Sequence, residues 1–204
     1  MESTSQKFGR DQINAVTFYT NYGEDPCAHL RLRGPMHHLN IEVIDGKVKG
    51  KTYPNYSQQG DVVVLQRDFP RDLPSYKSIL KIAHKEKKNV IYDIDDLLYL
   101  MPESHPERES QHYIEALLPM LQAIYEADLV TTTTPKLRDE LLKFNPNVKI
   151  LPNYFDDSIW KLRKPVVSQK DNRGLVIGYM GSESHMPDLE FIQPVLKSLL
   201  DEYK

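Results

Sequence analysis

The chain has little cysteine, no long apolar run and no large excess of charge of either sign. Cys27 is the only cysteine in 204 residues, which excludes an internal disulfide and fits a reducing compartment. No apolar run approaches the ~20 residues that a membrane-spanning helix needs. The net charge of -3 does not favour a polyanion, so we expect no nucleic-acid partner.

Residues 1–12 are polar and lack the apolar core of a signal peptide, and we expect them to form a disordered lead-in. The remainder has an ordinary globular composition, with 40% hydrophobic and 27% charged residues. Its length suits one large domain and part of a second. These features together predict a cytoplasmic protein.

Short apolar runs alternate with longer amphipathic stretches along most of the chain. Strands are expected over 14–20, 41–44, 61–66, 89–93, 129–132 and 148–151, and helices over 28–39, 75–87, 110–127 and 134–144. Pro35 predicts a kink in the first helix, and residues 46–60 are expected to form a hairpin or an excursion. The alternation predicts an α/β fold with a Rossmann-like parallel sheet over residues 13–157.

A second structural unit is expected after a linker at residues 158–173. Residues 174–204 contain a strand-like run over 175–180, a glycine–serine loop and a helical pattern over 188–203. This is the first β–α unit of a second domain, and one such unit cannot bury its own apolar faces. We expect it to need the first domain, another copy of the chain or a missing C-terminal half.

Ligands of open parallel sheets bind beyond the carboxyl ends of the strands, so the residues there are candidates for chemistry. Asp93, Asp95 and Asp96 follow one buried strand, where carboxylates are costly unless they are solvated, paired or bound. They fit a metal-binding D-x-D motif, a phosphatase nucleophile of the haloacid-dehalogenase type, a catalytic or orienting acid, or simple turn caps. Leu97 replaces the threonine or valine that the phosphatase motif expects, which weakens that interpretation.

Three arginines are candidates for binding anionic groups, because guanidinium suits phosphate and carboxylate. Arg31 and Arg33 lie near the start of the first expected helix, and a pair of surface arginines is the alternative. Arg67 directly follows a buried strand and is the stronger candidate.

The loop before the last expected helix is a candidate phosphate site. Glycine at Gly181 lets a ligand approach the backbone, and a helix N-terminus attracts anions. Ser182 and His185 lie in the same loop, and Asp188 could cap the helix or orient His185. A plain helix cap is the alternative.

Seven ordered strings together resemble family 4 glycosyltransferases of the GT-B fold. The strings are NAVTFYT, RLRGPMHHL, DVVVLQR, IYDIDDLLY, ADLVTTTTPKL, VKILPNYFD and IGYMGSESHMPDL. The resemblance implies two Rossmann-like domains, with the acceptor bound mainly by the first and a nucleotide-diphosphate sugar mainly by the second. It also implies transfer with retention of configuration and no metal or other cofactor.

The resemblance assigns roles to residues in both units. Asp95 and Asp96 stand where many members place a histidine–aspartate pair, which implies a catalytic role in which aspartate replaces histidine. Donor contacts are implied for Gly181, Ser182 and His185. Acceptor contacts are expected of Thr133, Thr134, Arg31, Arg33 and Arg67.

The family's basic pair for the diphosphate and its second acidic motif would lie beyond residue 204. The resemblance therefore implies a glycosyltransferase, or a fragment of one, that acts in polysaccharide biosynthesis on a glycan, lipid-linked or protein acceptor. A lipid acceptor would place it at the inner membrane face. The alternatives are a non-catalytic remnant that binds a glycan, nucleotide or protein, and a hydrolase that uses Asp93 and Asp95.

Overall fold

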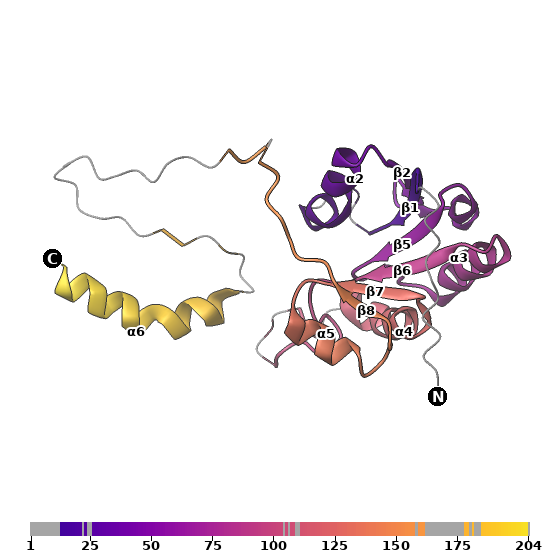
Figure 1. The fold of residues 1–204 in the computed structure, drawn as a ribbon. Helices are drawn as coiled ribbons and strands as arrows, with labels where there is room; N and C mark the ends of the chain where they lie inside the picture. Colours follow the sequence, from indigo (N-terminus) through magenta and orange to yellow (C-terminus); the bar gives the residue numbers. More distant parts are fainter. Residues whose placement is uncertain are drawn as a thin grey trace, which may run out of the picture.

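The computed structural model describes residues 13–21, 23, 26–103, 105, 107–108, 111–157, 159–161, 178–179, 181 and 185–203. Their main feature is a six-stranded sheet, all parallel, with the order β2–β1–β5–β6–β7–β8 (Figure 1). The strands are β1 (Ala15–Tyr19), β2 (Glu42–Asp45), β5 (Val62–Gln66), β6 (Asn89–Asp93), β7 (Leu129–Thr132) and β8 (Val148–Ile150). The α/β, Rossmann-like fold predicted from the sequence is confirmed.

Strand β5 is apolar from Val62 to Leu65 because both of its faces are covered. Val63 and Leu65 pack into one buried cluster, and Val62 and Val64 pack into a second cluster on the opposite face. Successive strand side chains point to opposite faces, so a continuous apolar run fills both cores at once.

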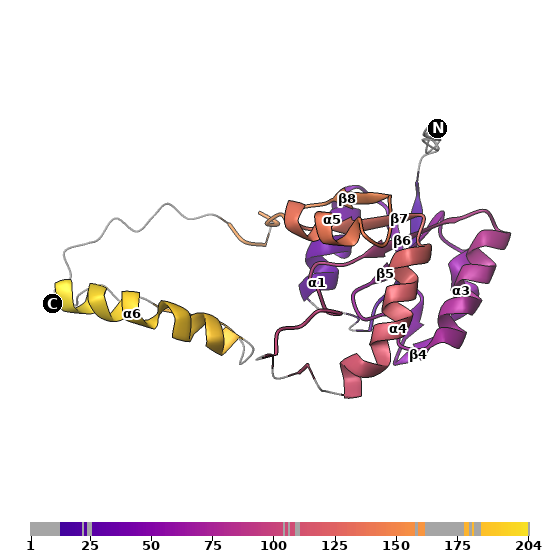
Figure 2. The same cartoon turned by 90° about the horizontal axis from the view of Figure 1, so that it is seen from below.

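Helices cover the two faces of the sheet. Helix α3 (Leu73–Lys85) and helix α4 (Gln111–Glu126) contribute Ile79, Met120 and Ile124 to the cluster that contains Val63. The first helical stretch consists of α1 (Pro26–Ala28), the π-helical η1 (His29–Arg33) and α2 (Gly34–His38), and it covers the other face through residues such as Leu32 (Figures 1 and 2).

Local signals explain where several helices begin. The Asp72 carboxylate accepts a hydrogen bond from the backbone N of Ser75 and caps α3. Thr134 caps α5 (Pro135–Leu141) in the same way through Leu137, and a proline occupies the first turn. Pro35 lies in the first turn of α2, directly after the π-helical segment, so the helix changes from π to α hydrogen bonding where the sequence predicted a kink.

The excursion after β2 contains a short antiparallel hairpin and one 3₁₀ turn. The hairpin pairs β3 (Lys47–Val48) with β4 (Lys51–Thr52), and the turn η2 spans Pro54–Gln58. Gly60 closes this segment against β1, where an added Cβ would lie 2.4 Å from the backbone N of Thr17. A side chain at this position would push the excursion off the sheet.

The predicted second unit is described only in part. Helix α6 (Met186–Glu202) confirms the expected helix over 188–203. The expected strand over 175–180 falls mainly outside the described residues, and Gly178 and Tyr179 are not in a strand. The expected lead-in over 1–12 and most of the linker over 158–173 also lie outside them. No residue of α6 is buried, and Figures 1 and 2 show the helix apart from the sheet.

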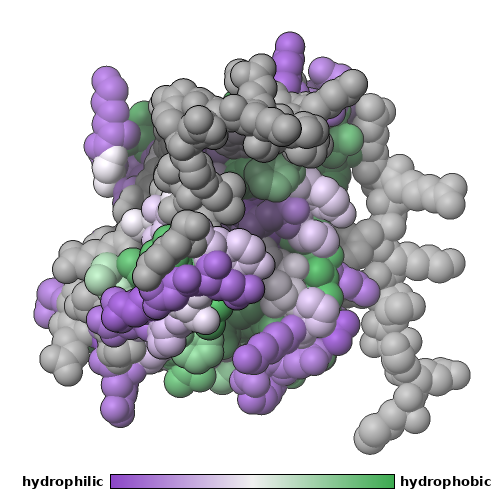
Figure 3. All heavy atoms as spheres, turned by 90° about the vertical axis from the view of Figure 1, so that its left-hand side faces the viewer, coloured by the Kyte–Doolittle hydropathy of each residue, from purple (hydrophilic) through white to green (hydrophobic). Residues whose placement is uncertain are grey.

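Large apolar side chains also reach the surface elsewhere. On α4, Leu118 is 64% exposed and Tyr125 is 72% exposed, although the opposite face of the same helix lies in the core. Figure 3 shows a face of the molecule on which apolar residues lie between hydrophilic ones. Within the described part of the chain, no helix is long and apolar enough to cross a membrane.

Candidate functional site

The candidate site lies at the carboxyl edge of the sheet, where the strand order reverses. Strand β1 pairs with β2 on one side and with β5 on the other, so the chain crosses in opposite directions from this point. In open α/β sheets this switch point is where ligands bind. The residues that follow β1, β5, β6 and β7 meet there, as the sequence predicted.

Arg31 and Asp93 form a buried ion pair in the floor of the site. The Arg31 Nε donates to Asp93 Oδ2 at 3.1 Å and Nη2 donates to Oδ1 at 2.5 Å, with side chains only 1% and 7% exposed. Thr131 Oγ1 donates to Oδ1 at 2.6 Å, and Gln66 Nε2 donates to Oδ2 at 3.4 Å. Each carboxylate oxygen therefore has two donors, which leaves Asp93 poorly suited to act as a nucleophile or metal ligand.

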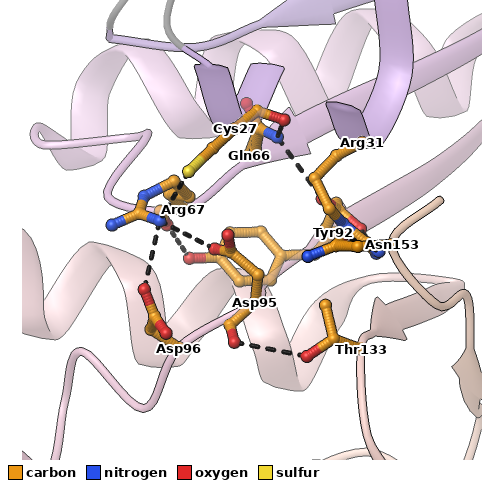
Figure 4. A network of polar contacts seen from close by, with 10 residues as sticks. Cys27, Arg31, Gln66, Arg67, Tyr92, Asp95, Asp96, Thr133 and Asn153 are labelled. Carbon is orange, nitrogen blue, oxygen red and sulfur yellow. Dashed lines mark hydrogen bonds and ion pairs between the residues drawn. The ribbon is translucent and has the colours of Figure 1, made fainter. Parts of the chain in front are cut away.

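The same guanidinium also holds the segment that follows β8. Arg31 Nη1 donates to the backbone O of Leu151, and to Asn153 Oδ1 at 3.2 Å (Figure 4). Arg31 is buried, which excludes the alternative that it is one of a pair of surface arginines. Its hydrogen bonds link the first helix, β6 and the chain after β8.

Arg67 has an unusual backbone at the end of β5. Its φ of 56° lies in the left-handed region, which residues with a Cβ seldom adopt and which costs of order 1–3 kcal/mol. Neighbouring groups hold it there, because its N–H donates to the backbone O of Asp93 at 2.9 Å and the Tyr92 hydroxyl donates to its carbonyl. Strain of this kind is concentrated at functional sites.

The Arg67 side chain lies between two carboxylates and a thiol. Its Nη1 is 2.9 Å from Asp95 Oδ1, 3.2 Å from Asp96 Oδ2 and 3.2 Å from Cys27 Sγ. Figure 4 shows the guanidinium with Cys27 on one side and the two aspartates on the other. Asp95 is mostly buried and Asp96 is 61% exposed, so this cluster opens to solvent on the side of Asp96.

Asp95 has the proton affinity of a candidate acid or base. Burial raises the pKa of its carboxyl above the ordinary value, the positive charge of Arg67 opposes this, and the charges of Asp96 and Asp93 add to the increase. A buried carboxyl with a raised pKa can exchange a proton closer to neutral pH than a solvated one. Asp95 therefore combines a place at the carboxyl edge of the sheet with a raised pKa.

The other predicted first-domain residues surround this cluster or lie beside it. Thr133 Oγ1 donates to the backbone O of Asp95 at 3.4 Å, which places it next to the cluster. Thr134 uses its hydroxyl to cap α5. Arg33 lies over the Phe18 ring and donates to Asp45 Oδ1 and to the backbone O of Gly23, so its guanidinium is directed away from Asp95.

The predicted donor-binding residues are described in part. Gly181 and His185 are exposed, and His185 Nδ1 is 3.0 Å from Asp188 Oδ2. This contact matches the proposed orienting role of Asp188. Ser182 lies outside the described residues.

Several members of the site lie in the strand-end segments that the sequence singles out, but nothing in the sequence assigns them a role. Cys27, Gln66, Thr131 and Asn153 each contact Arg31, Arg67 or Asp93. Their only sequence signal was their place just before, at or after the end of a strand. Over the part of the chain that the structure describes, no group of three histidine, cysteine or acidic residues could hold a metal ion.

Comparison with known proteins adds no family to this description. No protein-family model matches the chain, and no curated protein matches it.

Proposed function

We propose that the chain is a glycosyltransferase, or a fragment of one that retains activity, and that it transfers a sugar from a nucleotide-diphosphate donor to an acceptor hydroxyl. The proposal rests on Asp95, a mostly buried carboxyl with a raised pKa at the switch point of a Rossmann-like parallel sheet. The order of sequence strings that resembles the GT-B family supports the reaction class.

In this proposal Asp95 accepts a hydrogen bond from the acceptor hydroxyl and receives its proton as the new bond forms. Arg67 holds the carboxylate in position through its 2.9 Å contact and offsets part of its charge. Asp96 is the exposed member of the cluster and would contact the sugar hydroxyls that enter from solvent. Transfer with retention and without a metal follows only from the family resemblance.

The test measures release of nucleoside diphosphate from UDP-, GDP- and dTDP-sugars, with and without a mixture of oligosaccharide acceptors and without added metal. We expect one donor to be consumed, and Asp95→Asn to slow this about 10²-fold or more because proton transfer is lost. Asp139→Asn changes an exposed carboxylate on α5 and serves as the matched control.

Two results would direct the proposal elsewhere. Saturable donor or glycan binding in calorimetry, without turnover, would indicate a binding module. The structure is compatible with that function as well, because Asp95 and Asp96 already neutralise the charge of Arg67. Magnesium-dependent release of phosphate that is lost in Asp93→Asn would favour the phosphatase. Neither turnover nor binding with any donor or glycan would end the transferase proposal for this chain.

A further inference from the structure

Positive charge is concentrated in one stretch of the chain. Residues 47–88 contain ten lysines and arginines but only four aspartates and glutamates, which is a net charge of +6 in a chain whose total is -3. The rest of the chain therefore carries -9. Charge asymmetry of this kind indicates an interaction of the basic part with an anionic polymer or surface, although the total charge does not.

Part of this positive charge forms a row on the outer side of α3. Lys77, Lys81 and Lys85 follow one another at intervals of four residues, which brings them to one side of the helix. All three are exposed, and none makes an ion pair or a side-chain hydrogen bond with any residue that the structure describes. The opposite side of the helix packs on the sheet through Tyr76, Ile79, Leu80 and Ala83.

An apolar stripe lies on the outer side of α4. Ile114, Leu118 and Tyr125 are 50%, 64% and 72% exposed, and their spacing of four and seven residues places them on one side of the helix. Met120 and Ile124 are buried on the other side. The solvent side of a surface helix is ordinarily polar, so an apolar stripe there indicates contact with an apolar medium or partner.

The lysine row and the apolar stripe belong to one face of the molecule. Helices α3 and α4 cover the same side of the sheet and lie side by side (Figure 2). They are joined where the Tyr76 hydroxyl donates to Glu126 Oε2 at 3.0 Å. We call the outer side of these two helices the α3–α4 face.

The excursion after β2 extends this face beyond α3. Its turn η2 packs against α3, and Lys88 Nζ donates to the backbone O of Gln58 at 2.5 Å. Lys51 lies over the ring of Tyr53, which stacks on Tyr56 at 5.1 Å between ring centroids. Tyrosine rings beside lysines are typical of protein surfaces at the boundary between membrane and water.

Lysine is the only exposed basic residue of the hairpin, of α3 and of the residues next to the ends of α3. Six lysines and two carboxylates are exposed there: Lys49, Lys51, Lys77, Lys81, Lys85 and Lys87, and Asp72 and Glu86. On α4, Glu115 and Glu126 each accept a hydrogen bond from a glutamine, and the face keeps an excess of positive charge. Because protein interfaces favour arginine over lysine, an all-lysine face suits a diffuse anionic surface better than a protein partner.

We propose that the α3–α4 face binds the surface of a membrane that contains anionic lipids. The lysines contact lipid phosphates, and Ile114, Leu118 and Tyr125 enter the boundary between headgroups and acyl chains. Nucleic acid fits less well because its phosphate backbone offers nothing to the apolar stripe. The binding does not depend on whether Asp95 is catalytic, because the Arg67 cluster contributes no residue to this face.

The test is co-sedimentation of the chain with vesicles of phosphatidylcholine alone and of phosphatidylcholine mixed with phosphatidylglycerol, at low and at high salt concentration. We expect binding to the mixed vesicles, much weaker binding to the neutral ones, and a decrease with salt because salt screens the lysines. Asp95→Asn should bind like the unchanged chain, which separates this test from that of the transferase.

The charge variant is Lys77→Glu/Lys81→Glu, which we expect to bind the mixed vesicles about 25-fold more weakly or less, since each lysine near an anionic surface contributes about fivefold. Its matched control is Lys149→Glu/Lys197→Glu, with the same change in net charge. Val148 packs into the cluster beneath α3 and α4, so Lys149 points to the opposite side of the sheet, and Lys197 lies on α6. Thermal melts would check that all variants fold, as expected for exposed positions.

The apolar variant is Leu118→Ser/Tyr125→Ser, which we expect to weaken binding to the mixed vesicles about tenfold. Val195→Ser/Leu200→Ser removes side chains that are 60% and 65% exposed on α6 and serves as its control. That control should bind as the unchanged chain does, because the acidic residues of α6 oppose contact with an anionic surface.

Three results would overturn the proposal. The first is no binding, or equal binding to mixed and neutral vesicles. The second is an equal loss in a variant and its control, which for the serine pair would place the membrane contact on α6. The third is tighter binding to a duplex oligonucleotide than to the mixed vesicles at the same salt concentration, which would identify nucleic acid as the partner.

Discussion

Two arginine–aspartate contacts lie side by side at the carboxyl edge of the sheet, and they differ in how they are enclosed. Arg31 and Asp93 are nearly inaccessible, and both carboxylate oxygens are shared between the guanidinium and a neighbouring donor. Arg67 contacts Asp95 and Asp96, one of which is largely in solvent. The first contact uses all of its hydrogen-bonding capacity within the protein, whereas the second opens onto solvent.

The difference shows why charged residues at strand ends cannot be assigned to function by type alone. Asp93 and Asp95 are two residues apart, yet Asp93 completes a structural network and Asp95 has a raised pKa beside the exposed Asp96. Burial without full pairing is what perturbs Asp95. The comparison therefore predicts that substitutions in the Arg31–Asp93 pair mainly lower stability. Substitutions of Arg67 and Asp95 should mainly change the response to pH or to ligands.

The largest effect is expected from Arg31→Met. The change keeps much of the side-chain volume but leaves the Asp93 carboxylate buried without its counter-charge, which costs ~3–5 kcal/mol. Urea unfolding followed by circular dichroism would measure it. Arg33→Met breaks a partly exposed pair with Asp45 and should cost less than about 1 kcal/mol. Equal losses in the two variants would contradict the structural role of Arg31.

A smaller effect is expected from Arg67→Gln. The variant removes a charge-assisted hydrogen bond to Asp95, worth about 1.5–3 kcal/mol, but Asp95 can take up a proton in response. Because Arg67 opposes the rise in the pKa of Asp95, its removal should raise that pKa further. Carbon-detected NMR of the Asp95 carboxyl would measure the change, and a lower pKa in the variant would contradict it.

The smallest effect concerns the pH dependence of stability. The pKa of Asp95 in the folded chain is raised above the ordinary 3.8, so between these two values the folded state binds more protons than the unfolded state. The stability that Asp95 contributes is present below about pH 3.8 and is lost as the pH rises through its folded pKa.

Thermal melts of the unchanged chain and of Asp95→Asn, recorded from pH 4 to pH 8, would test this sign. We expect the unchanged chain to lose stability relative to Asp95→Asn as the pH increases. A difference in the opposite direction would mean that pairing with Arg67 outweighs burial and that Asp95 is ionised at low pH.

Much of the fold was predictable because local signals agree with the tertiary structure. Alternating apolar runs located all six strands of the sheet, and the Thr134–Pro135 pair marked the start of α5. The π-helical form of residues 29–33 was not predicted, because it depends on how the helix packs before Pro35. For residues 46–60 the sequence predicted a hairpin or an excursion, but it did not predict where the two short strands β3 and β4 begin and end.

The site was predictable only in outline. Strand ends identified Arg67, Asp95 and Asp96 as neighbours, but no pattern in the sequence pairs Arg31 with Asp93, 62 positions away. Cys27 and Asn153 lie in segments near strand ends, but nothing in those segments predicts that they contact Arg67 and Arg31. Which carboxylate is fully paired depends on side-chain packing across four elements, and periodicity carries no information about that.

The long-range hydrogen bonds of Arg31 affect how the chain folds during synthesis. Its guanidinium contacts residues 62 and 120 positions further along, so it cannot complete its hydrogen bonds until the segment after β8 has left the ribosome. Contacts between such distant residues form late because a long loop must close first. A nascent chain that ends before Leu151 would hold Asp93 with only part of its final network, which makes the arrival of this segment a checkpoint for co-translational folding.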